Sequence, residues 1–598
     1  MKSYLKYKNL YASLVLLVIL LFAFFLRLYG INWDQNQHLH PDERFLTMVT
    51  QAVSWPKSLS EYLDTNLSPL NPHNNNFGFY VYGTFPLFFV KAVAEFIGKA
   101  DYNSLTLTGR LISATLDTLT AFLVFLITFK ITKRWITSIF SLFIYTFSVL
   151  PIQLSHYFTV DPFLVFFSTL TFLLILHLKE HEKITSILLT SVLAGMSFGL
   201  AFASKIQVLL FLPTLLIGII LLPKKRDLLG ILLSLSVFIT SAFFSIRLAQ
   251  PYLFAEDSLL SLKLNTKTLD NWKELNNQYS EKTYRDNISI YFPPATIFIN
   301  AKDYLFPLEN IILWGSGIPL GLTYIIALIF LSFKSLKHIQ KSSNWPILLI
   351  IFWISYFFLY QGQVFAKYLR YFYIIYPFLS IVAALFLTEL KGNKTGKFVT
   401  LLILLPTVIW ALSFMSIYSR GHSRIKASEW IYRNIPAKSY LTHEHWDDML
   451  PLCIKSHPCG NYYNHIELPL YDTDTEEKWI KIKEKLDKAE YIILSSNRLY
   501  GSIMTVPDRY PKTSKYFESL FDASLGFVKV AEFTSRPTIP FFRSICITPP
   551  WTWYGKIARK LQECDSDSIS FVDDYADESF TVYDHPKVLI FKKTNENP

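Results

Sequence analysis

The stretch NWDQNQHLHPDERFLTMVTQAV, residues 32–53, decides how the rest of the chain is interpreted. It follows the first strongly apolar run and groups four polar side chains, namely His38, His40, Asp42 and Glu43. Pro41 suits the first position of a helix, where a missing N–H costs nothing. The two carboxylates then fall in the first turn, where the helix dipole stabilises negative charge. They either cap this helix or form part of an active site.

The helix that begins at Pro41 has one apolar stripe, because its apolar side chains recur at helical spacing. The stripe consists of Phe45, Met48, Val49, Ala52 and Val53. The segment is too polar to cross a membrane. An amphipathic helix of this kind is predicted to lie flat on the membrane face.

The composition is that of a polytopic membrane protein. Of 598 residues, 51% are hydrophobic and 17% are charged, whereas soluble proteins have about 25% charged residues. The net charge of +11 does not indicate nucleic-acid binding, because the basic residues cluster in short loops between apolar runs. The first run follows three lysines and resembles a signal peptide, but it is long and has no small-residue cleavage site, so a retained span is predicted.

Eleven apolar stretches are predicted to span the membrane and to form a domain over residues 1–417. They are 10–29, 110–129, 136–153, 163–178, 184–203, 206–222, 228–247, 309–333, 346–360, 370–387 and 398–417.

A cytoplasmic N-terminus places the basic loops on the cytoplasmic side, as the positive-inside rule requires. These loops contain Lys130, Lys133, Arg134, Lys179, Lys183, Lys224, Lys225, Arg226, Lys334, Lys337, Lys341, Lys391, Lys394 and Lys397. The long segments 30–109, 248–308 and 418–598 then lie on the opposite, extracytoplasmic face, with the short loop 154–162. Segment 77–97 is interrupted by glycine and proline and is predicted to be interfacial or re-entrant; if it spans, the count becomes twelve and the orientation argument fails.

Residues 418–598 are predicted to form an extracytoplasmic α/β domain, because helices and strands alternate. Predicted helices are 423–434, 476–489 and 514–521, and predicted strands are 439–442, 491–495, 527–533 and 582–592.

The cysteines, Cys453, Cys459, Cys546 and Cys564, all lie in this outer domain, where disulfides are permitted. Cys453 and Cys459 are either a small disulfide loop or free thiols, and the pairing of the four stays open.

Charged side chains beside predicted spans are costly and commonly functional. Asp161 lies at the entry to the fourth span, and Lys205, Lys367 and Arg370 lie on the outer face, against the positive-inside trend. Each base can extend to the interface individually. Together, a carboxylate base and several cations suit a reaction that deprotonates a hydroxyl and expels a phosphate.

Five motifs in this order resemble the GT-C glycosyltransferases of the protein O-mannosyltransferase and aminoarabinose-transferase type. They are HPDERF, YGTFPLFFVKAV, TVDPFLVFF, ASKIQVLLFLP and KYLRYFYIIYP, followed by HSRIKASEWIYRNIP at the start of the outer domain. The resemblance covers roughly residues 10–420. It implies a membrane enzyme that uses polyprenyl-phosphate-linked sugars.

The resemblance also implies roles for single residues. Asp42 is the expected catalytic base with Glu43 beside it, and Asp161 matches a second-loop carboxylate. Lys205 matches a lysine that contacts the donor phosphate; Arg370, Lys367 and Arg44 are further candidates for that phosphate. Arg44 stands one position nearer to the acidic pair than the arginine of the aminoarabinose branch. The sequence FPL at 85–87 replaces a double proline common there, so sugar and acceptor stay open.

The predicted function is transfer of a sugar from a polyprenyl-phosphate donor to an acceptor hydroxyl of a protein, lipid or cell-envelope glycan. The expected mechanism is an inverting displacement on the extracytoplasmic side. Alternatives are a transporter or flippase of lipid-linked sugars, which predicts charges near the bilayer midplane, and a non-catalytic envelope scaffold. Membrane lipids are expected partners, and nucleic acids are not.

No cofactor is expected. His38 and His40, close to the two acids, are weak candidates for a divalent metal site. A second polar cluster, His443, Glu444, His445 and Asp447, is interpreted as a solvated loop rather than a site.

Overall fold

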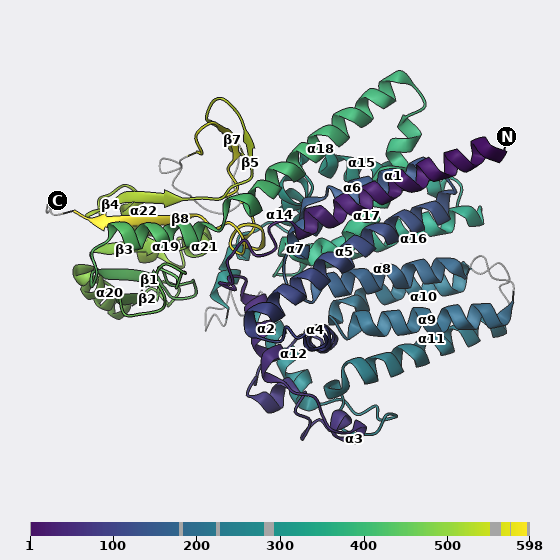
Figure 1. The fold of residues 1–598 in the computed structure, drawn as a ribbon, viewed down its shortest axis with the longest axis horizontal. Helices are drawn as coiled ribbons and strands as arrows, with labels where there is room; N and C mark the ends of the chain where they lie inside the picture. Colours follow the sequence, from purple (N-terminus) through teal and green to yellow (C-terminus); the bar gives the residue numbers. More distant parts are fainter. Residues whose placement is uncertain are drawn as a thin grey trace.

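The computed structural model describes residues 2–178, 183–222, 228–279, 292–549, 564–574 and 576–594. It consists of a bundle of long helices and, at one end of the bundle, a domain that contains β-sheets (Figure 1). The predicted loop residues Lys179, Lys224, Lys225 and Arg226 lie outside the described residues, as does part of the predicted outer loop 248–308.

The bundle is built from helices that follow the predicted spans. Its members are α1 (Lys2–Leu28), α5 (Tyr102–Thr132), α6 (Trp135–Thr146), α7 (Val149–Ser155), α8 (Asp161–His177), α9 (Ile184–Phe202), α10 (Leu212–Leu221), α11 (Leu228–Ala249), α14 (Leu305–Asn310), α15 (Ile318–Leu336), α16 (Trp345–Gln363), α17 (Tyr376–Leu390) and α18 (Lys394–Arg420). Short 3-10 turns precede α10 (η2, Ile206–Phe211) and α17 (η7, Leu369–Ile375), and a π-helical turn (η5, Ile311–Gly315) precedes α15.

All eleven predicted spans coincide with apolar helices, but fewer meet the length needed to cross a bilayer. In the described residues, seven helices are long and apolar enough, and the pair α6–α7, bent by 58°, makes an eighth if it is one span. The predicted spans at 10–29, 163–178 and 206–222 fall on shorter apolar helices. The last is shortened because its first turns are the 3-10 segment η2. The chain is a multi-pass membrane protein.

Charge inside the bundle is paired. The Asp117 carboxylate accepts hydrogen bonds from the Arg27 guanidinium and from the hydroxyls of Tyr145 and Tyr373, and all four side chains are fully buried. Because a lone charge is costly in an apolar surrounding, this network fixes α1 against α5, α6 and η7.

The first outer loop contains α2 (Pro41–Ala52), α3 (Leu59–Leu63) and α4 (Phe85–Phe96), with the 3-10 turn η1 (Pro72–Asn75). Pro41 is the first residue of α2, as predicted. The predicted apolar stripe is wrong in part, since Met48 is 46% exposed whereas Glu43 and Thr47 are fully buried. Polar contacts with α5 explain this orientation. Glu43 pairs with Arg110, and the Thr47 and Thr106 hydroxyls are 2.9 Å apart, so the Glu43–Thr47 face of α2 lies against α5. The twelve-residue α4 is too short to span the membrane.

The second outer loop contains the 3-10 turn η3 (Pro251–Leu253), α12 (Thr266–Gln278) and the 3-10 turn η4 (Pro293–Phe298). A last 3-10 turn, η6 (Ser342–Asn344), precedes α16 at the other end of the bundle.

The C-terminal domain has a five-stranded sheet in the order β2-β1-β3-β8-β4 and a three-stranded sheet in the order β5-β7-β6. The strands are β1 (Tyr440–Glu444), β2 (Asn464–Leu468), β3 (Tyr491–Leu494), β4 (Phe527–Phe533), β5 (Thr538–Pro540), β6 (Ile545–Ile547), β7 (Ser568–Phe571) and β8 (Val588–Lys593). The helices are α19 (Ser423–Asn434), α20 (Glu476–Lys488), α21 (Arg498–Ile503), α22 (Pro511–Phe521) and α23 (Glu578–Thr581). Strand β1 is parallel to β2 and β3, while β8 is antiparallel to its neighbours.

Most predicted elements of this domain are present, and both cysteine pairs are bonded. Cys453 joins Cys459, and Cys546 joins Cys564. The predicted strand 582–592 is wrong at its start, because β8 begins only at Val588.

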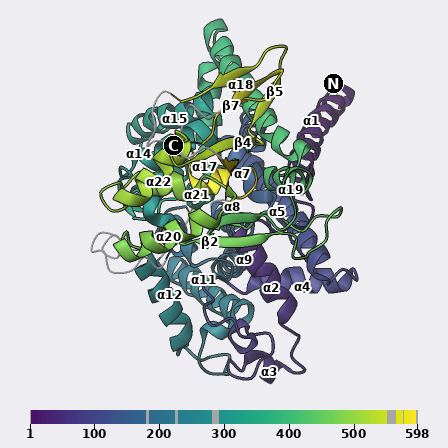
Figure 2. The same ribbon diagram turned by 90° about the vertical axis from the view of Figure 1, so that its left-hand side faces the viewer.

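The segment before β8 leaves the domain and enters the helical bundle. Phe580 and Tyr583 belong to the apolar core of the bundle. The indole N–H of Trp33 donates to the carbonyl of Asp584 over 3.3 Å, and the Gln153 amide donates to the carbonyl of Phe580 over 2.8 Å. The predicted domains 1–417 and 418–598 therefore share a core. Figure 2, viewed from this end, shows the C-terminal domain in front of the bundle.

Candidate active site

Asp42 lies at the wall of a cavity of about 480 Å³ between the bundle and the C-terminal domain. His40 is the N-cap of α2, with extended backbone dihedrals, and Pro41 follows it. This start places the carboxylate of Asp42 in the first turn, where it is 22% exposed. The local sequence therefore directs one carboxylate of the acidic pair into an accessible space.

Four parts of the chain form the cavity wall: the first outer loop, the second outer loop, η7 at the end of the bundle, and the C-terminal domain. The polar lining residues are Asp42, Arg44, Tyr82, Gln278, Tyr279, Tyr368, Arg370, Arg424, Asp447, Asp448, Arg498 and Tyr583, with Trp446 among the apolar ones.

The centre of the site is an ion pair between Asp42 and Arg370. Burial raises the pKa of the Asp42 carboxyl, but the Arg370 guanidinium and His40 outweigh that effect and lower the pKa to about 2. Burial and the adjacent Asp42 raise the pKa of Tyr82 well above 10. The site thus holds an ionised carboxylate beside a protonated phenol and a guanidinium.

A second ion pair lies close to the first. The Lys205 ammonium is 2.7 Å from the Asp161 carboxylate. Lys205 lies 5.1 Å from the Tyr371 ring centre and the Arg370 guanidinium lies 5.6 Å from it, so both cations contact one ring. The predicted gathering of Asp42, Asp161, Lys205 and Arg370 is present in the structure, although Lys205 and Asp161 do not line the cavity itself.

Gly83 explains how the Lys205 segment comes so close. A Cβ atom at Gly83 would lie 1.9 Å from the carbonyl oxygen of Ala203, so only glycine allows this approach. The Gly83 N–H donates to the carbonyl of Ser204 over 3.1 Å. The loop that carries Tyr82 is thereby fixed to the segment that carries Lys205.

Glu43 and Lys367 do not lie in the cavity wall. The Glu43 carboxylate is fully buried and accepts from Arg110, at 2.8 and 2.6 Å, and from the N–H of Phe158 at 2.7 Å. Arg110 also pairs with Asp34. Lys367 is buried and pairs with Asp303. Both predicted site residues have structural partners instead of an open face.

Arg44 lines the cavity but is already engaged. Its guanidinium is 2.8 Å from the Asp448 carboxylate and donates to the carbonyl of His38 over 2.8 Å. It therefore joins α2 to the C-terminal domain at the cavity wall.

The two histidines proposed as weak metal ligands, His38 and His40, both contact side chains of the protein. The ring nitrogens of His38 lie 2.8 Å from the Asn103 amide oxygen and 3.1 Å from the Thr106 hydroxyl. His40 packs between the rings of Tyr157 and Tyr583, and burial lowers its pKa to about 4. In the described ranges, no three His, Cys, Asp or Glu side chains are grouped so that they could hold a metal.

The C-terminal domain contributes cavity residues that sequence reasoning missed. Arg424, 1% exposed, pairs with Asp447 and Asp448, and Arg498 donates to the carbonyl of Trp446 over 2.7 Å. The interpretation of His443, Glu444, His445 and Asp447 as a solvated loop is wrong in part. His443 and Glu444 belong to strand β1, Glu444 is buried, and the Asp447 side chain is 1% exposed.

One sequence signal could have indicated these residues. Trp446, Asp447 and Asp448 follow strand β1, and ligands commonly bind at the carboxyl ends of parallel strands. Trp446 has φ +78°, a left-handed conformation that costs energy for a bulky residue and that clusters at functional sites.

Comparisons with known proteins place the fold. Residues 14–250 match the model of the family described as dolichyl-phosphate-mannose-protein mannosyltransferase. The Archaeoglobus fulgidus oligosaccharyltransferase, solved with a tethered acceptor peptide containing the NVT sequon, is similar with a TM-score of 0.52 and 14% identity, over 85% of this chain and 72% of that one. The same archaeal enzyme, AglB, in complex with an inhibitory peptide and a dolichol-phosphate gives a TM-score of 0.52 and 13% identity over the same shares. No curated protein sequence matches the chain.

ArnT from Cupriavidus metallidurans bound to undecaprenyl phosphate is also found, with 11% identity over 82% of this chain and 94% of that one. Its TM-score of 0.41 is too low to support an argument. The family match over residues 14–250 and the shared fold together point to one class, the GT-C membrane glycosyltransferases, as the motifs predicted. Within that class, the family matched over residues 14–250 is that of the protein mannosyltransferases.

Proposed function

We propose that this protein transfers a sugar from a polyprenyl-phosphate donor to an acceptor hydroxyl in the cavity at Asp42. The observation that carries the proposal is the pair formed by Asp42 and Arg370, a base and a phosphate-binding cation in one accessible cavity. The match to a family named for dolichyl-phosphate-mannose and the archaeal structure with dolichol-phosphate support such a donor.

The reaction begins when the donor phosphate binds Arg370. The guanidinium then exchanges the Asp42 carboxylate for the phosphate, which releases the carboxylate to accept a proton. Because Arg370 is what holds the pKa of Asp42 at about 2, neutralisation of that cation by a phosphate raises the basicity of Asp42. Donor binding therefore activates the base.

The chemical step is a single displacement with inversion. Asp42 takes the proton of the acceptor hydroxyl, the hydroxyl oxygen attacks the anomeric carbon, and the bond from that carbon to the phosphate oxygen breaks. Arg370 and Lys205, which both contact the Tyr371 ring, stabilise the leaving phosphate. Asp161, paired with Lys205, orients that lysine.

The acceptor reaches Asp42 past the C-terminal domain, whose residues Trp446 and Arg498 form the opposite wall. It carries a free hydroxyl on a protein, a lipid or an envelope glycan, and the family description favours a protein. The position of the basic loops at the other end of the bundle supports, under the positive-inside rule, a cavity on the extracytoplasmic side.

No metal cofactor is proposed, because Arg370 and Lys205 supply the positive charge at the phosphate. Turnover that persists after EDTA treatment is expected. Loss of turnover in EDTA, restored by a divalent cation, would contradict this part of the proposal alone.

The test is a transfer assay with radiolabelled polyprenyl-phosphate sugars and membrane acceptors. Asp42→Asn removes the base but keeps the shape, so turnover is expected to fall about 10²–10⁴-fold while donor binding and expression persist. Asp487→Asn, the same change on the exposed face of α20, is the matched control. Wild-type turnover in Asp42→Asn, or label that crosses the bilayer without transfer, would refute the proposal.

A further inference from the structure

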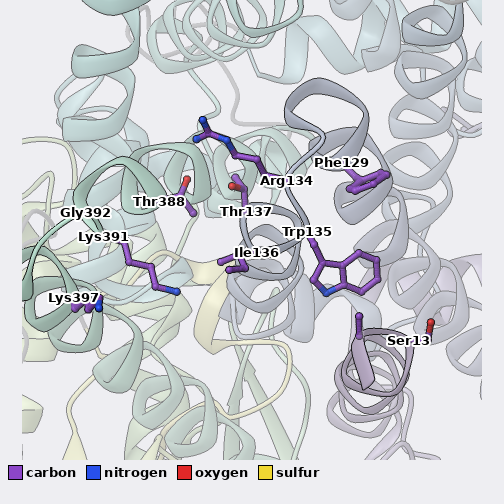
Figure 3. A pocket seen from close by; sticks show the side chains of 11 residues that line it. Ser13, Phe129, Arg134, Trp135, Ile136, Thr137, Thr388, Lys391, Gly392 and Lys397 are labelled. Carbon is purple, nitrogen blue, oxygen red and sulfur yellow. The ribbon is translucent and has the colours of Figure 1, made fainter. Parts of the chain in front are cut away.

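The end of the bundle opposite Asp42 contains a second cavity, of about 930 Å³. Its lining comes from α1, the end of α5, the start of α6, the end of α17 and the start of α18 (Figure 3). Arg110 and Phe129 lie on one helix, α5, and are roughly 28 Å apart along it at 1.5 Å per residue. Since Arg110 binds Glu43 and Phe129 lines this second cavity, the two cavities lie near opposite faces of the membrane.

The lining is basic and apolar at once. Three cations, Arg134, Lys391 and Lys397, line it with Phe129, Trp135 and Ile136. Figure 3 shows the Lys391 side chain extended into the cavity toward Ile136. None of the described residues that line it carries a carboxylate. This combination is complementary to a molecule with an anionic group and a hydrocarbon part.

The charges of the lining are largely uncompensated. Within the part of the chain that the structure describes, neither Lys391 nor Lys397 forms an ion pair with a carboxylate, and the Lys391 ammonium lies 5.1 Å from the Phe140 ring centre. The nearby Glu389 is 2.8 Å from Lys334 and 3.9 Å from Arg134. Two ammonium groups at this cavity therefore have no carboxylate counter-charge among the described residues.

The first turn of α6 adds hydrogen-bond donors. Trp135, Ile136 and Thr137 line the cavity, and no side chain caps this helix at Arg134. Free N–H groups at a helix start favour a bound anion. The cavity thus offers lysines, an arginine and backbone donors to one negative group.

The surroundings fit a hydrocarbon chain. Toward the membrane centre, α1 exposes Leu14 and Leu17, and α18 exposes Leu401 and Leu405, all more than half exposed. A lipid whose phosphate lies among the lysines would cover these side chains with its acyl chains. Basic pockets between membrane helices at this face are known to suit anionic headgroups.

We propose that this cavity binds an anionic glycerophospholipid of the leaflet opposite the candidate active site, with its phosphate held by Arg134, Lys391 and Lys397. The lipid fixes the ends of α1, α6, α17 and α18 relative to one another. The proposal is independent of the proposed transfer reaction, since none of these residues lies near Asp42.

The experiment measures lipid retention and thermal stability of the purified full-length protein. Native mass spectrometry in the presence of phosphatidylglycerol is expected to show retained lipid, whereas phosphatidylcholine is not retained. Phosphatidylglycerol is also expected to raise the Tm. The double variant Lys391→Gln with Lys397→Gln is expected to retain phosphatidylglycerol on the order of tenfold less.

The matched control is Lys337→Gln with Lys341→Gln, two lysines outside the cavity lining at the same end of the bundle. It is expected to retain lipid as the wild type does. Equal loss in both double variants would refute the site, because it would indicate general surface attraction. Equal protection by inorganic phosphate alone would also refute it, because the acyl chains would then contribute nothing. A variant that fails to fold is replaced by Lys391→Arg with Lys397→Arg, which keeps the charges and is expected to keep the lipid.

Discussion

Two arginines beside the first turn of α2 show how differently one kind of ion pair can be used. Arg370 pairs with Asp42 at the wall of a cavity, where both side chains are partly exposed, at 13% and 22%. Arg110 pairs with Glu43 and Asp34 where all three side chains are at most 1% exposed. The carboxylates are neighbours in the sequence, yet Asp42 faces the cavity and Glu43 is completely enclosed.

The difference between these two pairs is whether the charged groups can still bind a ligand or only stabilise the fold. The enclosed pair has every strong donor and acceptor satisfied, so it has no capacity left for a ligand. The open pair can exchange partners when an anion enters the cavity. Because both side chains are partly exposed, Arg370 can bind the anion and release Asp42. An acidic pair in a sequence therefore does not indicate two catalytic carboxylates.

The largest expected effect is on stability, from Arg110→Met. This change leaves two carboxylates buried without a cation, which typically costs about 3–5 kcal/mol. We expect strongly reduced expression and a large fall in Tm, measured by scanning fluorimetry in detergent. Arg433→Met, on the exposed face of α19, is the control. An Arg110→Met protein as stable as this control would contradict the structural role.

The next effect is on turnover, from Arg370→Met. Loss of one preorganised charge that stabilises the leaving phosphate typically costs about 10²–10³-fold in rate. We expect this fall in the transfer assay with a much smaller change in Tm than Arg110→Met causes. Arg370→Lys is expected to recover part of the rate. If both arginine variants lost stability equally, the contrast between the open and the enclosed pair would be wrong.

The smallest expected effect is the pH dependence of stability that arises from a second buried cluster, His585 with Asp573 and Asp584. Burial lowers the pKa of His585, but Asp584 and Asp573 outweigh it and raise the pKa to about 10. A pKa raised from 6.5 gives stability that is full below pH 6.5 and is lost as the pH rises toward about 10. We expect Tm to decline over this range in the wild type.

The same pH series of His585→Gln is expected to begin at a lower Tm and to decline less between pH 6.5 and 10. His445→Gln, a half-exposed histidine, is the control and is expected to follow the wild type. Parallel curves for the wild type and His585→Gln would show that this imidazolium does not stabilise the fold.

Sequence reasoning succeeded where local patterns determine structure. The apolar runs located the bundle helices, Pro41 located the start of α2, and residues 423–434 are helix α19. The motif order also singled out Asp42, Asp161, Lys205 and Arg370, which form two ion pairs whose cations both contact Tyr371. These residues are detectable because a charge beside an apolar run is costly and therefore conspicuous.

Sequence reasoning failed where the outcome depends on contacts between distant segments. In the sequence Glu43 is as plausible a site residue as Asp42, but in the fold it is buried in an ion pair with Arg110 of α5. Lys367 is in the same way as plausible as Arg370, but its ammonium is buried in an ion pair with Asp303. The contribution of Arg424, Arg498 and Tyr583 depends on how the C-terminal domain docks, which no local pattern encodes.

The entry of the α23 segment into the bundle has a consequence for biosynthesis. Trp33 and Asp584, joined by a hydrogen bond, are 551 positions apart in the chain. A ribosome that has inserted every membrane helix has therefore still not delivered Tyr583, the ring that packs against His40. The polypeptide lacks this part of its apolar core until Tyr583 has been added, so termination before that residue removes part of the cavity wall as well as part of the outer domain.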